Sequence, residues 1–234
     1  MLTLEADRAV LARAQLFRGL PPEDVAPIIE EFECRDLRAG TNVYEQGEVE
    51  VPELYILLSG RVAITRRTGG GRGRRELIGP GETFGELSVL DPGPRERTAS
   101  TMTSVRLAAL GRDAYLAWAL VRPHVAERLL RVLARRLRRT DDEALDLLFV
   151  DVGARLAKAL TDLTKRFGQP TPQGIIVDHG LSQTQLAEMV GTSRETLNKQ
   201  LHSFADRGWL TTGRGTIIVR APERLEYRAS ISEA

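Results

Sequence analysis

The sequence contains very little cysteine, histidine and aromatic side chain. Cys34 is its only cysteine, so an internal disulfide and a cysteine-ligated iron–sulfur cluster within one chain are both excluded. The three histidines lie far apart and lack the spacing of metal ligands. We find no nucleophile with a neighbouring base, and paired carboxylates occur only in solvated stretches such as TDDEALD. We therefore expect neither a metal site nor an enzyme.

Long apolar runs and a strong net charge are also missing. The longest apolar run, AYLAWALV, is far below the ~20 residues that cross a bilayer. The N-terminus MLTLEADRAV has neither the basic nor the apolar region of a secretion signal. The net charge of the 234 residues is +1, so a nucleic acid would have to be bound by a local patch. With 42% apolar residues the chain can form one or two cores, and we expect a cytoplasmic protein without a membrane partner.

Residues 36–110 contain most of the strand signals. Glycines punctuate short runs rich in β-branched and apolar residues, namely TNVYEQ, ELYILLSG, RVAITRR, RELIG and SVRLAALG. Such evenly spaced short strands predict a small sandwich or barrel. Residues 1–33 read as helical, with one helix starting near the prolines of PPEDVAPIIEEF. The stretch TGGGRGRRE at 68–76 lacks the Gly-Lys-Ser/Thr ending of a phosphate-binding loop, and we interpret it as a hairpin tip.

A long helix is predicted from Pro123 to about Leu148. Two interleaved sets of residues recur every seven positions in it: Leu130, Leu137, Ala144 and Leu133, Thr140, Leu147. Heptad spacing is typical of a helix that pairs with another along a seam. We expect this helix to form the interface of a homodimer. The alternative is a long helix that packs only on its own domain.

Residues 181–210, LSQTQLAEMVGTSRETLNKQLHSFADRGWL, have the pattern of two short helices joined by Gly191. Ser182 and Gln185 form a capping-box pattern at the first helix, and Ser193 can cap the second. The predicted inner face consists of Leu186, Ala187, Val190, Leu197, Leu201 and Phe204. The stretch GWLTTGRGTIIVRAP that follows predicts a two-stranded hairpin. A helix-turn-helix with such a hairpin is a winged DNA-binding arrangement, and the alternative is a helix pair that binds no DNA.

The first turn of the second helix would enter the major groove of DNA. Arg194 can pair with guanine O6 and N7, and Glu195 can accept a hydrogen bond from cytosine N4. Ser193 and Thr196 can reach phosphates. The candidate DNA-binding residues are Gln183, Thr184, Ser193, Arg194, Glu195, Thr196 and Lys199. An upstream helix, capped by Asp151, would open this second compact unit of the chain.

Two of these stretches resemble a known family. The run SRETLNKQL after GT resembles the recognition helix of the cAMP receptor protein/FNR family of bacterial transcription regulators, and FGELSVLDPGPRERTAS at 84–100 resembles its phosphate-binding cassette. The resemblance covers about residues 16–220. It implies an α+β protein with a cyclic-nucleotide-binding β-roll (jelly roll) at 1–122, a dimerisation helix at 123–149 and a winged helix-turn-helix domain at 150–234.

The resemblance also implies a ligand site. By position, Glu86 would bind the ribose 2′-hydroxyl of cAMP and Arg97 would pair with its cyclic phosphate, while Gly85 lets the backbone approach closely. The implied ligand-binding residues are Gly85, Glu86, Leu87, Arg97, Thr98, Thr140 and Asp141. The alternative for Glu86 and Arg97 is an ion pair inside the roll.

This chain departs from the family's pattern at two ligand positions. Thr98 stands where a serine is usual in the cAMP receptor protein. Thr140 and Asp141 match a threonine and a serine that touch the adenine from the dimer helix, so the carboxylate of Asp141 is a departure. Beside cAMP, cGMP or no ligand at all therefore stays open. The absence of the N-terminal cysteine cluster argues against FNR-type iron–sulfur sensing.

The implied function is that of a homodimeric, sequence-specific DNA-binding transcription regulator, with RNA polymerase as a further partner. Arg194, Glu195 and Lys199 carry over as reading residues, and they favour a palindromic operator with TGTGA-like half-sites; Lys199 is usually arginine. Ligand binding would reorient the winged domains about a hinge near Phe149–Val152. The alternatives are a ligand-independent regulator with a vestigial pocket and a nucleotide sensor that acts through protein partners.

Overall fold

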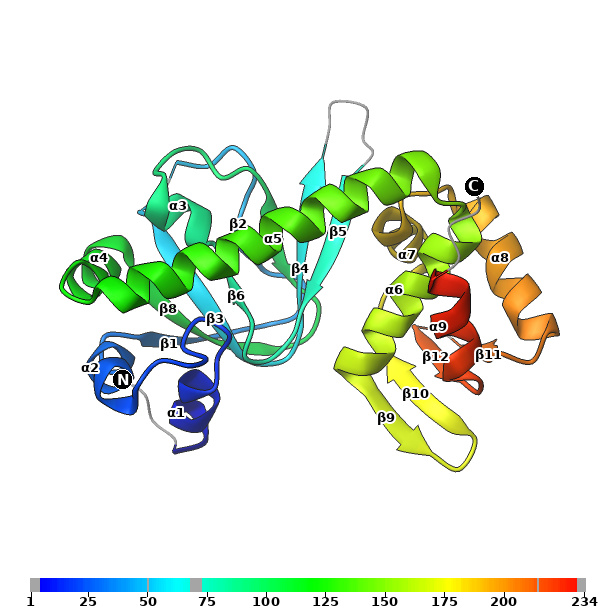
Figure 1. The fold of residues 1–234 in the computed structure, drawn as a ribbon, viewed down its shortest axis with the longest axis horizontal. Coiled ribbons are helices and arrows are strands. Elements are labelled where there is room, and N and C mark those ends of the chain that lie inside the picture. Colours follow the sequence, from blue (N-terminus) through cyan, green and yellow to red (C-terminus); the bar gives the residue numbers. More distant parts are fainter. Residues whose placement is uncertain (1–4, 50, 68–72, 214, 231–234) are drawn as a thin grey trace. The chain divides into compact units, whose positions relative to one another are not determined.

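The structure, a computed structural model, describes residues 5–49, 51–67, 73–213 and 215–230. Contacts divide the chain into two compact units: the first comprises residues 1–68 and 76–137, and the second comprises residues 69–75 and 138–234 (Figure 1). Residues 68–72 of the predicted hairpin tip lie outside the described residues. Each unit has its own core and is described by itself.

The first unit combines short helices with eight strands among its described residues. The helices are α1 (Glu5–Ala12), α2 (Pro22–Ile29), α3 (Glu86–Leu90), α4 (Arg112–Leu120) and the first half of α5 (Pro123–Phe149). The strands are β1 (Glu33–Leu37), β2 (Asn42–Tyr44), β3 (Glu53–Ser59), β4 (Val62–Arg67), β5 (Gly73–Ile78), β6 (Thr83–Phe84), β7 (Thr98–Thr101) and β8 (Val105–Gly111). Prolines open α2 and α5 as predicted, because the first helical residue needs no amide hydrogen.

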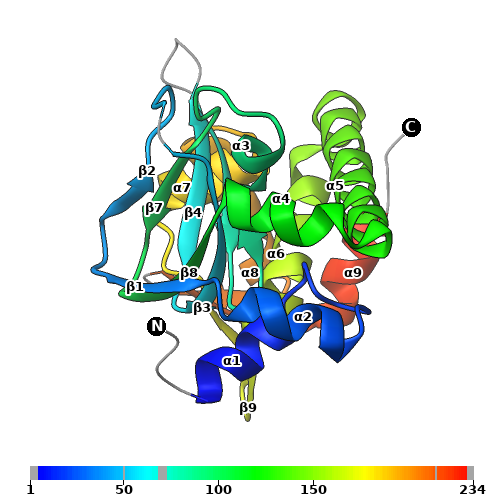
Figure 2. The same cartoon turned by 90° about the vertical axis from the view of Figure 1, so that its left-hand side faces the viewer.

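Two antiparallel four-stranded sheets form a β-roll, in the orders β1-β8-β3-β6 and β2-β7-β4-β5. Strand β3 is buried on both faces. Leu54, Ile56 and Leu58 join the core under the helices, whereas Tyr55 and Leu57 point into the core between the sheets. Figure 2 shows the short helices α1, α2 and α4 gathered beside this unit's strands. The predicted sandwich or barrel is confirmed as a roll.

Helix α5 takes part in both units. Val125 and Leu129 are buried in the core of the first unit, and Leu133 packs against that core. Leu130 and Leu137, both from the first of the two heptad sets, are 65% and 63% exposed. The long helix is confirmed, and its first turns do pack on their own domain. Its exposed leucines leave an apolar stripe for the pairing that the heptads predict.

The second unit is a helical domain with a small sheet (Figure 1). After the end of α5 come α6 (Val152–Phe167), β9 (Gly168–Thr171), β10 (Gly174–Asp178), α7 (Gln183–Val190), α8 (Arg194–Asp206), β11 (Leu210–Thr212), β12 (Thr216–Val219) and α9 (Pro222–Ser230). The sheet order is β11-β12-β10-β9. Asp151 caps α6 as predicted, since its carboxylate accepts from the amides of Gly153 and Ala154 at 2.8 and 3.2 Å.

The predicted wing is confirmed as β11 and β12, which pair antiparallel. The hairpin β9–β10 and the helix α9 were not predicted. Strand β9 reads GQPT and has no apolar alternation, and α9 buries only Leu225 among its described residues. No helix in the described ranges is both long and apolar enough to span a bilayer. Within those ranges, no group of three or more His, Cys, Asp or Glu side chains is placed to hold a metal ion.

Candidate functional site

The cassette of the first unit turns at Gly85, between β6 and α3. Gly85 has φ of +77°, which side chains rarely tolerate, and an added Cβ would lie 3.0 Å from both the Glu53 carbonyl oxygen and the Tyr55 ring. Glycine is therefore required at this turn, both for its positive φ and for its close approach to β3. Glu86 follows as the first residue of α3 and is only 5% exposed, whereas Leu87 is exposed.

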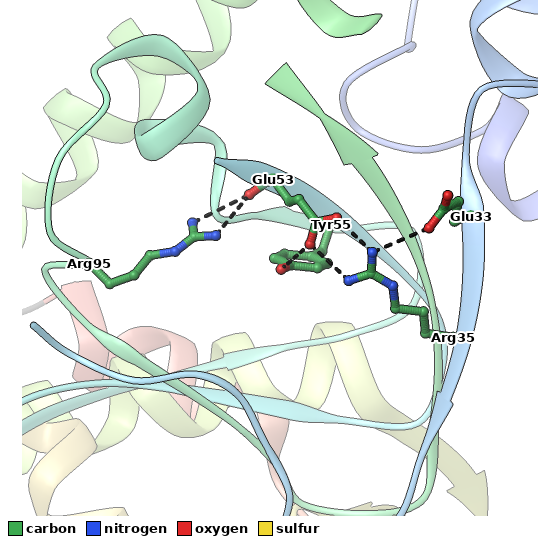
Figure 3. A network of polar contacts seen from close by, with 5 residues as sticks. All are labelled: Glu33, Arg35, Glu53, Tyr55 and Arg95. Atoms are coloured by element: carbon green, nitrogen blue, oxygen red, sulfur yellow. Dashed lines mark hydrogen bonds and ion pairs between the residues drawn. The ribbon is translucent and has the colours of Figure 1, made fainter. Parts of the chain in front are cut away.

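Arg95, which was not among the predicted ligand residues, is buried against this turn. One of its amino groups donates to the carbonyl oxygen of Gly85 at 3.3 Å and also to the Ser88 hydroxyl. Both amino groups approach the carbonyl oxygen of Glu53, at 3.3 and 3.4 Å (Figure 3). The guanidinium carbon lies 4.3 Å from the centre of the Tyr44 ring. Arg95 thus holds the cassette turn through neutral oxygen atoms and a ring face.

A second arginine explains why Arg95 faces only the backbone of Glu53 (Figure 3). Arg35 of β1 holds the Glu53 carboxylate with two bonds of 2.8 and 2.6 Å, and the Tyr55 hydroxyl donates to it at 2.8 Å. Burial alone would raise the pKa of Glu53, but the hydrogen bonds from Arg35 and Tyr55 outweigh it and lower that pKa. Burial, and then the bond to Glu53, raise the pKa of Tyr55. The Glu53 carboxylate is therefore hydrogen-bonded by Arg35 and Tyr55, and Arg95 acts on it only through its charge.

Arg97 and Thr98 lie at the start of β7. Arg97 is half-buried, and its Nη1 lies 3.6 Å from the Glu76 carboxylate. The Thr98 hydroxyl accepts a hydrogen bond from the backbone amide of Gln46 at 3.0 Å. The stretch PRER contains two candidate arginines, Arg95 and Arg97. The resemblance selected Arg97, which precedes the threonine, and so left out Arg95, which is buried. The signal that could have found Arg95 is its place directly after Pro94, at the end of the loop from α3.

The cassette's donor set fits an anion that sits beside a hydroxyl group. A buried guanidinium whose described partners are uncharged atoms favours an incoming phosphate, which it can bind with two parallel hydrogen bonds. The buried carboxylate of Glu86 can accept from a sugar hydroxyl. Thr140 and Asp141, the other two predicted ligand residues, are exposed on α5 in the second unit, and their contact with a ligand stays a prediction.

The helix-turn-helix of the second unit forms as predicted. The Ser182 hydroxyl accepts from the Gln185 amide at 3.2 Å, and the Gln185 side chain accepts from the Ser182 amide at 2.9 Å. Gly191 makes the turn with φ of +72°. Ser193 caps α8 by accepting from the Thr196 amide at 3.1 Å. The predicted inner face is buried throughout, at Leu186, Ala187, Val190, Leu197, Leu201 and Phe204.

The candidate DNA-binding residues share the outer face of this motif. All are exposed except Thr196, which is half-buried. The Gln183 side-chain oxygen accepts from Arg194 at 3.4 Å and from Asn198 at 3.1 Å, so it links the starts of α7 and α8. An open groove of about 620 Å³ continues along α8, lined by Asn198, Lys199, His202, Ser203, Asp206 and Arg207. The outer face of α8 is therefore polar, with its cations exposed, as a helix that enters a DNA groove requires.

Comparisons with known proteins match both units. Residues 34–119 match the family model of the cyclic nucleotide-binding domain, and residues 154–228 match that of the Crp-like helix-turn-helix domain. The chain is 44% identical over 221 residues to the CRP-like cAMP-activated global transcriptional regulator of Mycobacterium tuberculosis, covering 94% of this chain and 98% of that protein. It is 40% identical over 213 residues to the cyclic AMP receptor protein of Thermus thermophilus, covering 90% and 94%.

A solved structure agrees with these matches. The crystal structure of the Thermus thermophilus catabolite activator protein superposes with a TM-score of 0.54 at 38% identity, covering 92% of this chain and 98% of that one. The two domain models match the two compact units one after the other, and each of the two sequence relatives aligns with both units. The chain therefore belongs to the CRP/FNR family of DNA-binding transcription regulators.

Proposed function

We propose that the protein is a homodimer that binds a palindromic operator through α8 and responds to cAMP bound in the β-roll. The observation that carries this proposal is the presence, in one chain, of a buried arginine at the cassette turn and of the capped helix α8 with a polar, exposed outer face. The named relatives respond to cAMP, which supports the same ligand here. RNA polymerase would be the partner that reads the bound state.

The proposed ligand set keeps the predicted residues and adds one. Gly85, Glu86, Leu87, Arg97 and Thr98 would act from the roll, and Thr140 and Asp141 from α5. Arg95 joins them, because its buried guanidinium already lies at the cassette turn. The cyclic phosphate would bind between the turn and a guanidinium, and Glu86 would accept from the ribose hydroxyl.

The DNA proposal is tested with a fluorescent TGTGA-N6-TCACA duplex titrated with and without cAMP. Arg194→Ala should weaken binding by about 5- to 150-fold, because a lost bidentate base contact costs ~1–3 kcal/mol. Arg166→Ala is the matched control, since Arg166 pairs within α6 with Asp162 and lies off the predicted DNA-binding face. Equal binding by wild type and Arg194→Ala, or equal affinity for a scrambled duplex, would contradict the assignment.

The ligand proposal is tested by calorimetric titration with cAMP and with cGMP. Arg95→Leu and Arg97→Leu are compared with Arg66→Leu, which removes an exposed arginine at the end of β4. We expect heat from cAMP in the wild type and in the control, and a loss of at least tenfold in affinity when the phosphate-binding arginine is removed. Unchanged affinity in both cassette variants would exclude this phosphate site.

A second candidate is a regulator that needs no ligand. It is favoured by the partners that the cassette side chains already have: Thr98 accepts from Gln46, Arg97 lies near Glu76, and Arg95 binds three oxygen atoms. In this case neither nucleotide gives heat, the duplex is bound at full affinity without cAMP, and Arg97→Leu leaves that affinity unchanged.

A further inference from the structure

Arg155 of α6 contacts the ends of two other helices at once. Its Nη1 donates to the Val150 carbonyl oxygen at 2.6 Å and approaches that of Asp146 at 3.4 Å, at the C-terminal end of α5. Its Nε donates to the Val190 carbonyl oxygen and its Nη2 to that of Gly191, both at 3.2 Å, at the C-terminal end of α7. One guanidinium therefore joins the last turn of α5 to the turn of the helix-turn-helix.

The chemistry of helix ends explains why an arginine suits this place. The last four carbonyl groups of a helix have no partner within the helix, and they carry its partial negative charge. A guanidinium offers five donors in a rigid planar fork, so it can serve two helix ends together. A lysine has a single charged nitrogen and could not span both sets.

Two other contacts support the same junction. Lys158, one turn after Arg155, pairs with the Asp146 carboxylate at 2.5 Å. The Leu147 side chain of α5 lies against the helix-turn-helix turn, where a Cβ built on Gly191 would be 2.4 Å from its Cδ2. The end of α5 is thus held against the turn by apolar packing, by an ion pair and by Arg155.

We propose that Arg155 is a positioning residue that makes the last turn of α5 and the turn before α8 move as one body. A change in α5 would then reach the recognition helix directly. These contacts of Arg155, which we call the brace, extend across residues 149–152, where a hinge was expected from the sequence. Bending at that point would have to break these bonds or move both helix ends together. This inference rests on the proposed ligand switch only for its functional readout.

The functional test compares duplex affinity with and without cAMP. In Arg155→Met the ratio of the two affinities should fall at least fivefold toward 1, because the signal in α5 no longer moves α8 in step. Arg155→Lys should restore only part of the ratio, and Arg166→Met on the same helix should keep the wild-type value. An unchanged ratio in a folded Arg155→Met variant overturns the proposal.

A second readout needs neither ligand nor DNA. Amide hydrogen exchange should show that Arg155→Met loses protection in residues 146–150 and 188–193 together, while β10 and β12 keep theirs and so report an intact fold. Loss of protection in one segment alone, or in neither, contradicts the brace. If wild-type duplex affinity ignores cAMP, the proposed switch fails while paired loss of protection still supports the brace. The two ideas can therefore fail separately.

Discussion

At the scale of single residues, the cassette turn and the junction between α5 and the helix-turn-helix are both held by arginines whose partners are mainly backbone atoms. Arg95 binds the carbonyl oxygens of Gly85 and Glu53, and Arg155 binds those at the ends of α5 and α7. Asp151 works with the opposite charge, because it accepts from two amides at the start of α6. Its carboxylate also pairs with Arg228 of α9 at 2.5 Å. Residues of this kind set backbone geometry.

Asp151 gives the protein a defined acid sensitivity. Burial alone would raise the pKa of Asp151, but hydrogen bonds from Arg228 and from the Ala154 and Gly153 amides outweigh it and lower that pKa. The resulting stability is fully present above the unfolded pKa of ~3.9 and is lost as pH falls through the lower folded pKa. Asparagine can still cap the helix, but it loses the charge that pairs with Arg228 and favours the helix N-terminus, so Asp151→Asn should lower the free energy of unfolding by about 0.5–1 kcal/mol at pH 7.

Urea denaturation at pH 7, 4 and 3 checks this prediction. The difference in unfolding free energy between wild type and Asp151→Asn should shrink as the pH falls. At low pH the wild-type carboxylate becomes protonated and is then uncharged, like the asparagine side chain. Asp162→Asn is the control, since Asp162 forms a partly buried i,i+4 pair within α6 and caps no helix. A difference that stays constant over this pH range would show that the charge of Asp151 does not contribute.

At the scale of elements, the amphipathic helices were the most predictable parts. The two helices around Gly191, the cap at Asp151 and the whole inner face were read from apolar spacing and capping residues. Short elements were missed when their pattern was weak. Strand β1 reads ECRDL and β9 reads GQPT, and the sheets fix both by pairing with neighbours distant in sequence or across a turn. The spacing of apolar and polar residues within such a short segment does not indicate which strand it pairs with.

The cassette shows the same limit at the scale of a site. Gly85 and Glu86 were predicted, and the structure places both at the turn. Arg95 was missed because its role depends on the carbonyl oxygen of Glu53, which lies 42 residues earlier. The two arginines of PRER are equivalent as letters, and only their burial separates them, at 6% exposure for Arg95 against a half-buried Arg97.

The helix-turn-helix turn offers a test with a built-in control. Gly191→Ala places a Cβ in the left-handed region and 2.4 Å from Leu147, whereas Gly208→Ala, with φ of +73°, meets nothing within 4 Å. Each should cost ~1–2 kcal/mol of unfolding free energy from backbone strain. Gly191→Ala should cost more than Gly208→Ala, and Leu147→Ala in the same chain should remove that excess. If urea denaturation gave equal losses of unfolding free energy for the two variants, the Leu147 side chain would move away from the added Cβ at no energetic cost.

At the scale of the whole molecule, charge gives little guidance and the apolar stripe of α5 gives more. The net charge is +1, so DNA binding depends on where the cations lie rather than on their number. Leu130 and Leu137, seven residues apart on this helix, are 65% and 63% exposed. Exposed leucines at heptad spacing are typical of a surface covered by a second copy.

Leu137→Glu should therefore break the proposed dimer. Burying a leucine contributes about 1.5 kcal/mol or more, and the substitution occurs in both subunits, so dimer affinity should fall by about a hundredfold. Sedimentation at micromolar concentration measures this as a shift from dimer to monomer. Val49→Glu is the control, because Val49 is 77% exposed in the loop after β2 and not on the helix. A monomeric wild type would contradict the proposed assembly itself.

The brace at Arg155 depends on the identity of one side chain, the donor, and not on the side chains of the residues that accept its hydrogen bonds. Its four acceptors belong to the main chain, and every amino acid, proline included, supplies the same carbonyl oxygen. Substitutions at Val150 or Val190 thus leave the acceptors in place, and a charge reversal cannot rescue a lost guanidinium as it would in an ion pair. We expect evolutionary drift to be tolerated on the accepting side and restricted at one arginine.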